Sequence, residues 1–276
     1  MTDTNKTKVG FIGLGSQGAP IAERMLLAGH ELTVWARRPE SAQDLVDKGA
    51  VLAPSVEALA AACDYVGVCV VDDAGVEDVC GKLIPALKAG SVLVIHSTIL
   101  PASCVDLAKR CAAAGIDFVD APVSGGGPAA SAGTLTVMCG TTPEIFAKAL
   151  PVLETFGGKV VLLGPAGSAQ QAKIINNSLM AAHMGLAFSA LSLADRIGVD
   201  RAALSDLIKH SSGRSFGFEV FARLPTPEAF AHGASLLLKD VDLLGSILGP
   251  GGGDNALAAA ALPFLNATGV IRKSEQ

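Results

Sequence analysis

The chain lacks the charge density and the charge clusters that several classes of protein need. Only 17% of its 276 residues are charged and 50% are hydrophobic, which argues against a disordered chain or a coiled coil. Lys and Arg form no stripe and the net charge is -5, so the clustered basic side chains that bind nucleic acid are missing. We therefore expect a folded protein of one large or two modest domains without a nucleic-acid partner.

Patterns for metal and nucleophilic catalysis are also missing. The six cysteines form no CxxC pair and have no histidine at zinc spacing, so we expect buried thiols and no metal site. They are Cys63, Cys69, Cys80, Cys104, Cys111 and Cys139. The five histidines form no HExxH pattern, and neither Ser97 nor Ser124 lies in a GxSxG turn.

No segment has the pattern of a signal peptide or of a comfortable membrane span. The segment Met1–Lys8 is polar. The most apolar stretch, Leu179–Ala194, contains His183 and two serines and runs directly into Asp195. We expect a cytoplasmic protein in which this stretch is a buried helix.

The first part of the chain alternates between β-branched runs and amphipathic Ala/Leu-rich segments. We expect strands at Val9–Ile12, Leu32–Trp35, Tyr65–Val71, Val92–His96 and Phe118–Asp120. We expect helices at Ile21–Ala28, Ala42–Asp47, Val56–Ala62 and Val105–Ala114, three of them ending at Gly29, Gly49 and Gly115. Such alternation predicts an α/β Rossmann domain with a mostly parallel, doubly wound sheet over residues 1–164.

The character of the sequence changes after Gly164. Ser168–Ile197 has no proline and a helical apolar pattern, which predicts one helix of about 30 residues, about 45 Å long. The remainder is typical of short helices without strands. We therefore expect an all-α domain over residues 165–276, joined to the first domain by the long helix.

A glycine-rich turn follows the first expected strand. The segment Val9–Gly18 reads VGFIGLGSQG, a strand that leads through a GxGxxG turn into a helix. In this pattern Gly13 permits the tight turn, Gly15 lets the backbone approach a diphosphate, and Gly18 allows close packing of helix and strand. The helix N-terminus then offers its N–H groups to the phosphates, so the turn predicts a dinucleotide.

The end of the second strand indicates which dinucleotide. Ala36-Arg37-Arg38-Pro39 contains no carboxylate to hold a free ribose hydroxyl. Two guanidinium groups suit a 2′-phosphate through paired charged hydrogen bonds. We therefore expect NADP rather than NAD.

Two further segments carry polar groups suited to substrate chemistry. Asp120–Gly127, DAPVSGGG, sets the hydroxyl of Ser124 beside glycines whose N–H groups can face an anion, although such a segment alone is equally an ordinary turn. Lys173 and Asn177 lie four residues apart on one face of the long helix. The helix is otherwise uncharged as far as Asp195, so the ammonium group would lose hydration, which suits proton transfer.

Together these motifs resemble the β-hydroxyacid dehydrogenase family, which includes 3-hydroxyisobutyrate dehydrogenases and tartronate, glyoxylate and succinic semialdehyde reductases. GLGSQG is similar to its cofactor loop, of the kind in the 6-phosphogluconate dehydrogenase NADP-binding domain, and DAPVSGG to its substrate signature. GSAQQAKIINN, from Gly167, resembles its catalytic helix, and Leu238–Val241 its late cofactor segment. The resemblance implies an NADP-dependent oxidoreductase acting on CH–OH groups and a homodimer or homotetramer.

The resemblance also implies a role for each matching residue. Lys173 would be the general acid and base, while the substrate would contact Ser124, Gly125, Gly126, Asn177 and Phe230. The cofactor would contact Gly13, Leu14, Gly15, Ser16, Gln17, Gly18, Arg37, Arg38, Val71, Thr98 and Lys239. The substrate would be a small carboxylate-bearing alcohol or aldehyde. Arg214 is open between binding a second anion and capping a helix.

Two alternatives remain open at this point. Related enzymes reduce imines with NADPH, although they usually lack the catalytic lysine. A non-catalytic NADP-binding module would keep the glycine turn but would not need Ser124, Lys173 and Asn177 together.

Overall fold

The structure is a computed structural model that describes residues 6–249 and 255–271. The chain divides into two compact units, an N-terminal unit of residues 1–173 and a C-terminal unit of residues 174–276. The division falls inside the long helix α8 (Ser168–Ile197). The predicted boundary at residue 164 coincides instead with the end of the last strand, β9 (Gly157–Gly164).

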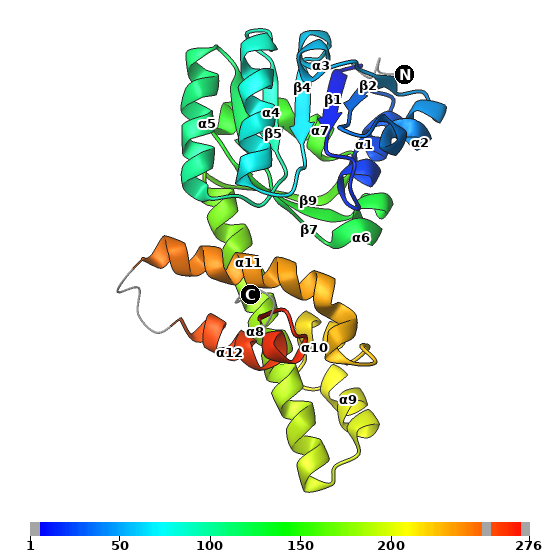
Figure 1. The fold of residues 1–276 in the computed structure, drawn as a ribbon, viewed down its shortest axis with the longest axis vertical. Helices are drawn as coiled ribbons and strands as arrows, with labels where there is room; N and C mark the ends of the chain where they lie inside the picture. Colours follow the sequence, from blue (N-terminus) through cyan, green and yellow to red (C-terminus); the bar gives the residue numbers. More distant parts are fainter. Residues whose placement is uncertain (1–5, 250–254, 272–276) are drawn as a thin grey trace. The chain divides into compact units, whose positions relative to one another are not determined.

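One sheet forms the centre of the N-terminal unit (Figure 1). Its first six strands are β1 (Lys8–Ile12), β2 (Glu31–Trp35), β3 (Val51–Leu52), β4 (Tyr65–Val68), β5 (Val92–Ile95) and β6 (Asp117–Asp120). They are parallel and lie in the order β3-β2-β1-β4-β5-β6. This doubly wound order has its switch point between β1 and β4, where ligands bind at the carboxyl ends of the strands. The predicted Rossmann fold is confirmed.

The sheet continues past β6 with three strands that the sequence did not predict. They are β7 (Val123–Ser124), β8 (Leu135–Gly140) and β9. β8 is antiparallel to β6 and β7 and parallel to β9. Val123 and Val137 are fully or nearly fully buried, so this extension belongs to the core of the unit.

Helices cover both faces of this sheet (Figure 1). On one face lie α1 (Gly18–Leu27), α2 (Gln43–Asp47), α6 (Gly126–Ala132) and α7 (Pro143–Leu153). On the other lie α3 (Val56–Ala62), α4 (Asp73–Ala86) and α5 (Pro101–Ala113). A 3-10 turn, η1 (Pro39–Ala42), precedes α2. Each face therefore has its own apolar core, with the sheet buried between them.

Local chemistry explains where several elements begin and end. β4 ends at Val68, earlier than predicted, because the chain turns toward the next strand and the Val70 N–H donates to Ser97 Oγ at 2.9 Å. Asp72 then caps α4, a helix missing from the prediction, by accepting the Gly75 N–H at 2.9 Å. The expected left-handed glycines after α1, α2 and α5 are confirmed, with φ of 93°, 108° and 71° at Gly29, Gly49 and Gly115.

The described part of the C-terminal unit is helical, as predicted. Besides most of α8 it contains α9 (Arg201–Lys209), α10 (Phe216–Phe221), the 3-10 turn η2 (Pro227–Phe230), α11 (Ala231–Leu248) and α12 (Ala256–Ala267). Its core joins α8, α10, α11 and α12 around Phe218, Phe221 and Phe264. α12 approaches α8 closely, since a Cβ at Gly185 would lie 1.8 Å from the carbonyl oxygen of Ala260.

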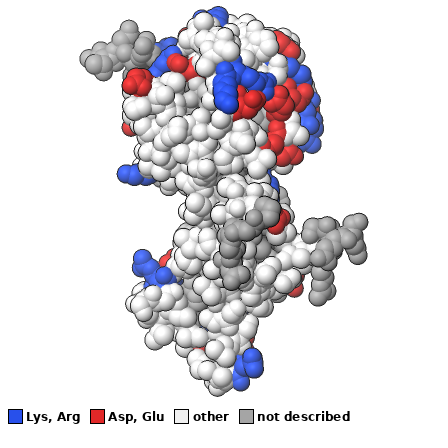
Figure 2. All heavy atoms as spheres, turned by 90° about the vertical axis from the view of Figure 1, so that its left-hand side faces the viewer, with Lys and Arg blue, Asp and Glu red and all other residues white. Residues whose placement is uncertain are grey.

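The helix α8 has the bounds expected from the sequence. It is long and apolar enough, by length and composition alone, to cross a membrane. Of its most apolar window, 44% is buried within the protein. The six cysteines are free thiols; all are buried except Cys69, which is half-buried. On the face of the molecule in Figure 2, basic and acidic side chains intermix on the N-terminal unit.

A buried histidine packs between two aromatic side chains of the N-terminal core. The His96 ring stacks on Phe11 with centroids 5.8 Å apart and meets the edge of Phe156 at 5.5 Å. Its Nδ1 lies 2.9 Å from the carbonyl oxygen of Ala121, so Nδ1–H is the donor, and the buried Nε2 has no hydrogen-bond partner among the described residues. Burial lowers the pKa of His96 to about 4, which keeps the ring neutral in the folded protein.

This histidine makes the stability of the fold depend on pH. Because its folded pKa lies below the ordinary value of 6.5, its contribution is complete above pH 6.5 and is lost as the pH falls toward 4. At pH 5 we expect His96 to lower the free energy of unfolding by about 2 kcal/mol relative to neutral pH. The variant His96→Gln should not show this decrease. Urea unfolding at several pH values between 7.5 and 5 gives the free energy of unfolding of wild type and variant. The slope of this free energy against pH is then compared between the two proteins.

The slope of wild type has to be compared with that of His96→Gln, because Asp120 also contributes to it. The raised pKa of Asp120 changes the free energy of unfolding in the opposite direction over the same pH range. His210→Gln, at an exposed position at the end of α9, is the control for the replacement itself. Equal slopes for His96→Gln and wild type would contradict the prediction.

Candidate active site

The glycine-rich turn has the geometry that its sequence predicts. Gly13 has a φ of 99°, and a Cβ there would lie 2.1 Å from the carbonyl oxygen of Cys69, at the end of β4. A Cβ at Gly18 would lie 1.9 Å from the carbonyl oxygen of Gly13, so this glycine allows α1 to approach β1. A Cβ at Gly15, by contrast, meets nothing within 4 Å. The backbone at Gly15 is therefore open to a ligand.

The start of α1 is suited to an anionic group. Gln17 occupies the cap position without a side-chain cap hydrogen bond, and the first turn contains no acidic residue. Leu14 packs against the core, whereas Ser16 is exposed and Gln17 is half-buried. The N–H groups of a helix N-terminus bind phosphate well, and the open space at Gly15 admits it, so these residues fit a dinucleotide diphosphate.

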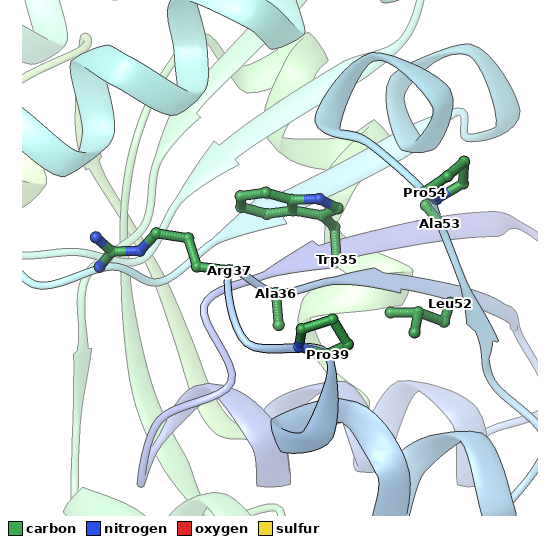
Figure 3. A pocket seen from close by; sticks show the side chains of 7 residues that line it. All are labelled: Trp35, Ala36, Arg37, Pro39, Leu52, Ala53 and Pro54. Carbon is green, nitrogen blue, oxygen red and sulfur yellow. The ribbon is translucent and has the colours of Figure 1, made fainter.

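A pocket of about 410 Å³ lies at the tip of β2, where the ribose end of a dinucleotide is expected (Figure 3). It is lined by Trp35, Ala36, Arg37, Pro39, Leu52, Ala53 and Pro54. In the view of Figure 3 the guanidinium of Arg37 extends to the side of the Trp35 indole away from Pro54. Arg38 is exposed and stands at the N-cap position of η1, without a side-chain cap hydrogen bond. The two predicted arginines thus stand beside an apolar pocket that contains no acidic residue.

The segment DAPVSGGG lies against the glycine-rich turn. Ser124 belongs to the short strand β7, and the two glycines that follow have positive φ, 133° at Gly125 and 72° at Gly126. A Cβ at Gly127 would lie 2.8 Å from the carbonyl oxygen of Ser16. The predicted substrate segment and the predicted cofactor turn are therefore neighbours within one unit.

A buried carboxylate fixes the start of α8. Asp120, at the end of β6, accepts the N–H of Gly167 at 2.9 Å and that of Gln170 at 3.2 Å. Burial raises the pKa of the Asp120 carboxyl to about 6, against the effect of these two hydrogen bonds. The carboxylate satisfies N–H groups that the first helical turn leaves without partners, and it faces the positive end of the helix dipole.

A glutamine side chain adds a second attachment on the same turn. Gln170 Nε2 donates to the carbonyl oxygen of Ser97 at 2.9 Å, and its Oε1 accepts the Ile99 N–H at 3.2 Å. Lys173 lies one turn further along α8 and is buried. The turn before Lys173 is thus tied to the carboxyl ends of β5 and β6.

The remaining predicted cofactor residues of the N-terminal unit flank these attachments. Val71 is exposed and directly precedes Asp72, the cap of α4. Thr98 is half-buried and stands between Ser97 and Ile99, which contact Gln170. Both follow the ends of neighbouring strands, β4 and β5.

In the C-terminal unit a second carboxylate holds Asn177. Asn177 Nδ2 donates to Asp240 Oδ2 at 2.5 Å, which ties α8 to α11. Asp240 is buried, and its neighbour Lys239 lines a separate pocket of about 450 Å³ along α11. The amide of Asn177 is therefore oriented by a residue of the predicted motif Leu238–Val241.

Two other predicted residues of this unit have structural contacts. The ring of Phe230 packs into the helical core, 6.0 Å from that of Phe264. Arg214 is exposed, and its Nε lies 3.8 Å from Glu219 Oε1 on α10. These contacts give Phe230 a packing role and Arg214 an ion-pair partner next to the helix start. The substrate contact expected of Phe230 stays a prediction.

The sequence did not assign roles to five residues that shape these sites: Trp35, Ser97, Asp120, Gln170 and Asp240. Three of them, Asp120, Gln170 and Asp240, lie within the motifs recognised in the sequence, and this position was the indication that the sequence offered of their importance. Their partners are distant in the chain, 47 residues from Asp120 to Gly167 and 63 from Asn177 to Asp240, so only the folded structure reveals them. Among the described residues, no group of three His, Cys, Asp or Glu is placed to hold a metal ion.

Comparison with known proteins places both halves of the chain. Residues 8–164 match the family model for the NAD binding domain of 6-phosphogluconate dehydrogenase. Residues 167–267 match the model for the NAD-binding domain of NADP-dependent 3-hydroxyisobutyrate dehydrogenase. The chain is 35% identical over 240 residues to 2-(hydroxymethyl)glutarate dehydrogenase of Eubacterium barkeri, covering 86% of this chain and 80% of that protein. It is 34% identical over 251 residues to human mitochondrial 3-hydroxyisobutyrate dehydrogenase, covering 87% and 75%.

Solved structures show the same fold over nearly the whole chain. The 3-hydroxyisobutyrate dehydrogenase of Mycobacterium tuberculosis with L-serine superimposes with a TM-score of 0.86 at 26% identity, covering 98% of this chain and 100% of that one. Psf3 in complex with NADP⁺ and 2-OPP gives 0.83 at 29% identity, covering 96% and 94%. An imine reductase from Pseudomonas sp., at 22% identity and a TM-score of 0.66, shows the fold alone. The chain belongs to the β-hydroxyacid dehydrogenase family and is an NAD(P)-dependent oxidoreductase that acts on hydroxyl groups.

Proposed function

We propose that the protein transfers a hydride between NADP and a small alcohol or aldehyde that bears a carboxylate, with Lys173 as general acid and base. One observation carries this proposal. Gly127 lies against Ser16, and Asp120 holds the start of α8, so the predicted cofactor turn, carboxylate segment and catalytic helix meet at one end of a single sheet.

The cofactor residues divide according to the part of the dinucleotide that they suit. The open backbone from Gly13 to Gly18 suits the diphosphate. Val71 and Thr98, after β4 and β5, suit the ribose and the nicotinamide at the switch point of the sheet. A contact of Lys239 with the cofactor rests on the family resemblance.

The proposed substrate residues have separate roles in binding the carboxylate and in moving the proton. The Ser124 hydroxyl and the N–H groups of Gly125 and Gly126 donate to the substrate carboxylate, which fixes the orientation of the reacting carbon. The bound nicotinamide supplies or accepts the hydride. The Lys173 ammonium donates a proton to the forming alkoxide in reduction, and the amine accepts it in oxidation. A role of Asn177 in orienting the reacting oxygen rests on the family resemblance.

The names of the relatives suggest a substrate class. 3-Hydroxyisobutyrate and 2-(hydroxymethyl)glutarate, and the L-serine present in one related structure, share a hydroxymethyl group on the carbon next to a carboxylate. For this chain we propose the same unit, or the corresponding semialdehyde. This class agrees with the proposed carboxylate contacts of Ser124, Gly125 and Gly126, since Gly127, which follows them, lies against Ser16 of the glycine-rich turn.

The cofactor turn gives a prediction that separates binding from folding. An alanine at Gly15 meets no atom within 4 Å, so Gly15→Ala should fold normally, but its methyl group occupies space that the diphosphate needs. We expect NADPH to bind at least about tenfold more weakly, measured by fluorescence titration. Gly81→Ala in α4, where a Cβ also meets nothing within 4 Å, is the matched control. Unchanged affinity in Gly15→Ala would disprove this cofactor position.

The two arginines give a prediction about cofactor choice. In Arg37→Ala/Arg38→Ala the 2′-phosphate loses charged hydrogen bonds, so the KM for NADPH should rise about 10- to 100-fold. The KM for NADH, which lacks this phosphate, should change little. Arg201→Ala, which removes an exposed guanidinium on α9, is the control. An equal effect on both cofactors would refute a 2′-phosphate contact.

The central test is the reaction itself. Wild type should oxidise NADPH with C3 and C4 semialdehydes or glyoxylate, and reduce NADP⁺ with 3-hydroxy acids. Lys173→Ala should bind NADPH normally but lose about 10²- to 10⁴-fold in kcat, because no group exchanges the proton. Lys82→Ala, an exposed lysine on α4, should keep full activity. Near-wild-type turnover in Lys173→Ala, or activity with a cyclic imine alone, would overturn the proposal.

A further inference from the structure

The carboxylate that holds the start of α8 uses both of its oxygens. Asp120 Oδ1 accepts the N–H of Gly167 at 2.9 Å, and Oδ2 accepts the N–H of Gln170 at 3.2 Å. An ionised carboxylate is an acceptor only, whereas a protonated carboxyl group carries an O–H donor that would face one of these N–H groups. The attachment of the helix therefore depends on the ionised form.

The space around this carboxylate is closed. The Asp120 side chain is fully buried, and a Cβ at Gly140 would lie 2.3 Å from its Oδ1 and 2.8 Å from its Oδ2. The backbone of β8 thus packs against both oxygens and leaves the carboxylate little room to rotate. Where water is excluded, it cannot replace a hydrogen bond that the carboxylate loses.

Lys173 lies close to this attachment along the helix. It is the third residue after Gln170 and is itself buried. At a rise of about 1.5 Å per residue, its Cα lies about 4.5 Å along the helix axis from that of Gln170. A shift of the first turn therefore moves the Lys173 ammonium group, and a misplacement of about 1 Å can cost a large factor in rate.

The other attachment of the same turn is uncharged. The Gln170 side chain donates to the carbonyl oxygen of Ser97 at 2.9 Å and accepts the Ile99 N–H at 3.2 Å. An amide does not ionise between pH 5 and 8, so this attachment stays when the carboxylate changes its charge. Protonation of Asp120 should therefore loosen the first turn of α8 without releasing it from the sheet.

We propose that Asp120 is a positioning residue for the reaction, whose ionised carboxylate holds Lys173 where it exchanges the proton and whose protonation lowers turnover without weakening NADPH binding. This inference rests on the proposed role of Lys173 as general acid and base. Burial raises the pKa of the Asp120 carboxyl to about 6, against the effect of its two backbone hydrogen bonds. The change of charge therefore falls in a range in which turnover can be measured.

The thiols and the imidazole around Asp120 do not titrate in this range. Burial, and after it the charge of Asp120, raises the pKa of Cys104 on α5 and raises the pKa of Cys139 on β8 to about 12. Burial lowers the pKa of His96, which follows β5, to about 4. The remaining ionisable neighbour is Lys173 on α8 itself, and the direction of the assay separates it from Asp120.

Reduction of the aldehyde distinguishes the two groups. In this direction Lys173 has to carry a proton, so its own titration lowers kcat toward high pH, whereas protonation of Asp120 lowers kcat toward low pH. In the oxidation direction Lys173 has to be neutral, and both groups would lower kcat toward low pH. The assay therefore measures reduction.

The sign of the pKa shift separates positioning from unfolding. The folded pKa of Asp120 lies above the ordinary value of 3.8, so protonation of this group adds stability as the pH falls from about 6 toward 3.8. A purely structural role of the carboxylate thus predicts no loss of turnover over this range. A loss that belongs to Asp120 indicates positioning.

The first test compares wild type with Asp120→Asn in the reduction of a C3 or C4 semialdehyde at saturating NADPH. The neutral amide imitates the protonated carboxyl group, so kcat of the variant at pH 7.5 should be about tenfold below that of wild type. From pH 7.5 to 5, wild-type kcat should fall about fivefold toward that of the variant, whose own kcat stays constant. Fluorescence titration at pH 7.5 should give the same Kd for NADPH.

The matched control is Asp117→Asn, which makes the same replacement on the same strand. Asp117 is partly exposed and pairs with Lys148 at 2.7 Å on the surface. This variant should keep the wild-type kcat and its fall toward low pH. Circular dichroism at pH 7.5 and 5 establishes that each protein is folded.

A second test needs neither turnover nor a folded variant. In wild type labelled with ¹⁵N-glycine, the amide resonance of Gly167 should shift with a midpoint near pH 6, as Asp120 takes up its proton. In Asp120→Asn no glycine resonance should show this shift. The test measures the attachment directly, so it keeps its meaning if the proposed role of Lys173 fails.

The inference fails on any of four results. A fall of kcat toward low pH that persists in Asp120→Asn belongs to another group. A wild-type kcat in Asp120→Asn at pH 7.5, or a Kd for NADPH that weakens as much as kcat falls, shows that the carboxylate does not position Lys173. Titration of Gly167 without a fall in wild-type kcat separates the attachment from turnover. Near-wild-type turnover of Lys173→Ala, by contrast, refutes the proposed function itself.

Discussion

The carboxylate of Asp120 is the interaction on which the arrangement of this site depends. It is fully buried at the end of β6 and accepts two N–H groups from the start of α8. Burying a charge is costly unless it is hydrogen-bonded, and here the N–H groups and the helix dipole offset part of the cost, since burial still raises the pKa of Asp120 to about 6. Gly140 on β8 leaves space for this carboxylate, since a Cβ there would lie 2.3 Å from its Oδ1 atom. The position of the helix that carries Lys173 is thus set by the sheet.

The site combines a rigidly held helix start with backbone that is open to a ligand. Gln170 adds hydrogen bonds from the same helical turn to Ser97 and Ile99, so one end of α8 is attached to two neighbouring strands. The cofactor turn, by contrast, leaves open space at Gly15, where a Cβ would meet no atom within 4 Å. A catalytic group held by rigid elements loses less entropy when substrate binds, which agrees with hydride transfer that requires accurate orientation.

Different parts of the surface of α8 have different surroundings. Its first turn is tied to the sheet, and its inward face packs with Phe218 and Phe264 in the helical core. Large side chains such as Leu186 and Ile197 are exposed, so a helix that is apolar over most of its length is only partly buried within one chain. The apolar pattern therefore predicted the helix but did not reveal what covers each of its faces.

Local patterns in the sequence determined five of the six parallel Rossmann strands, all but β3, together with the GxGxxG turn, the bounds of α8 and the left-handed glycines at the helix ends. These features depend on periodicity and on φ, which neighbouring residues fix. Short strands such as β7 escaped prediction because two residues show no period. The tertiary structure alone decided that Asp120 caps α8, that Asp240 orients Asn177, and that the Phe230 ring packs near Phe264. Each of these contacts joins residues far apart in the chain, and a pair of distant side chains leaves no local pattern from which to predict it.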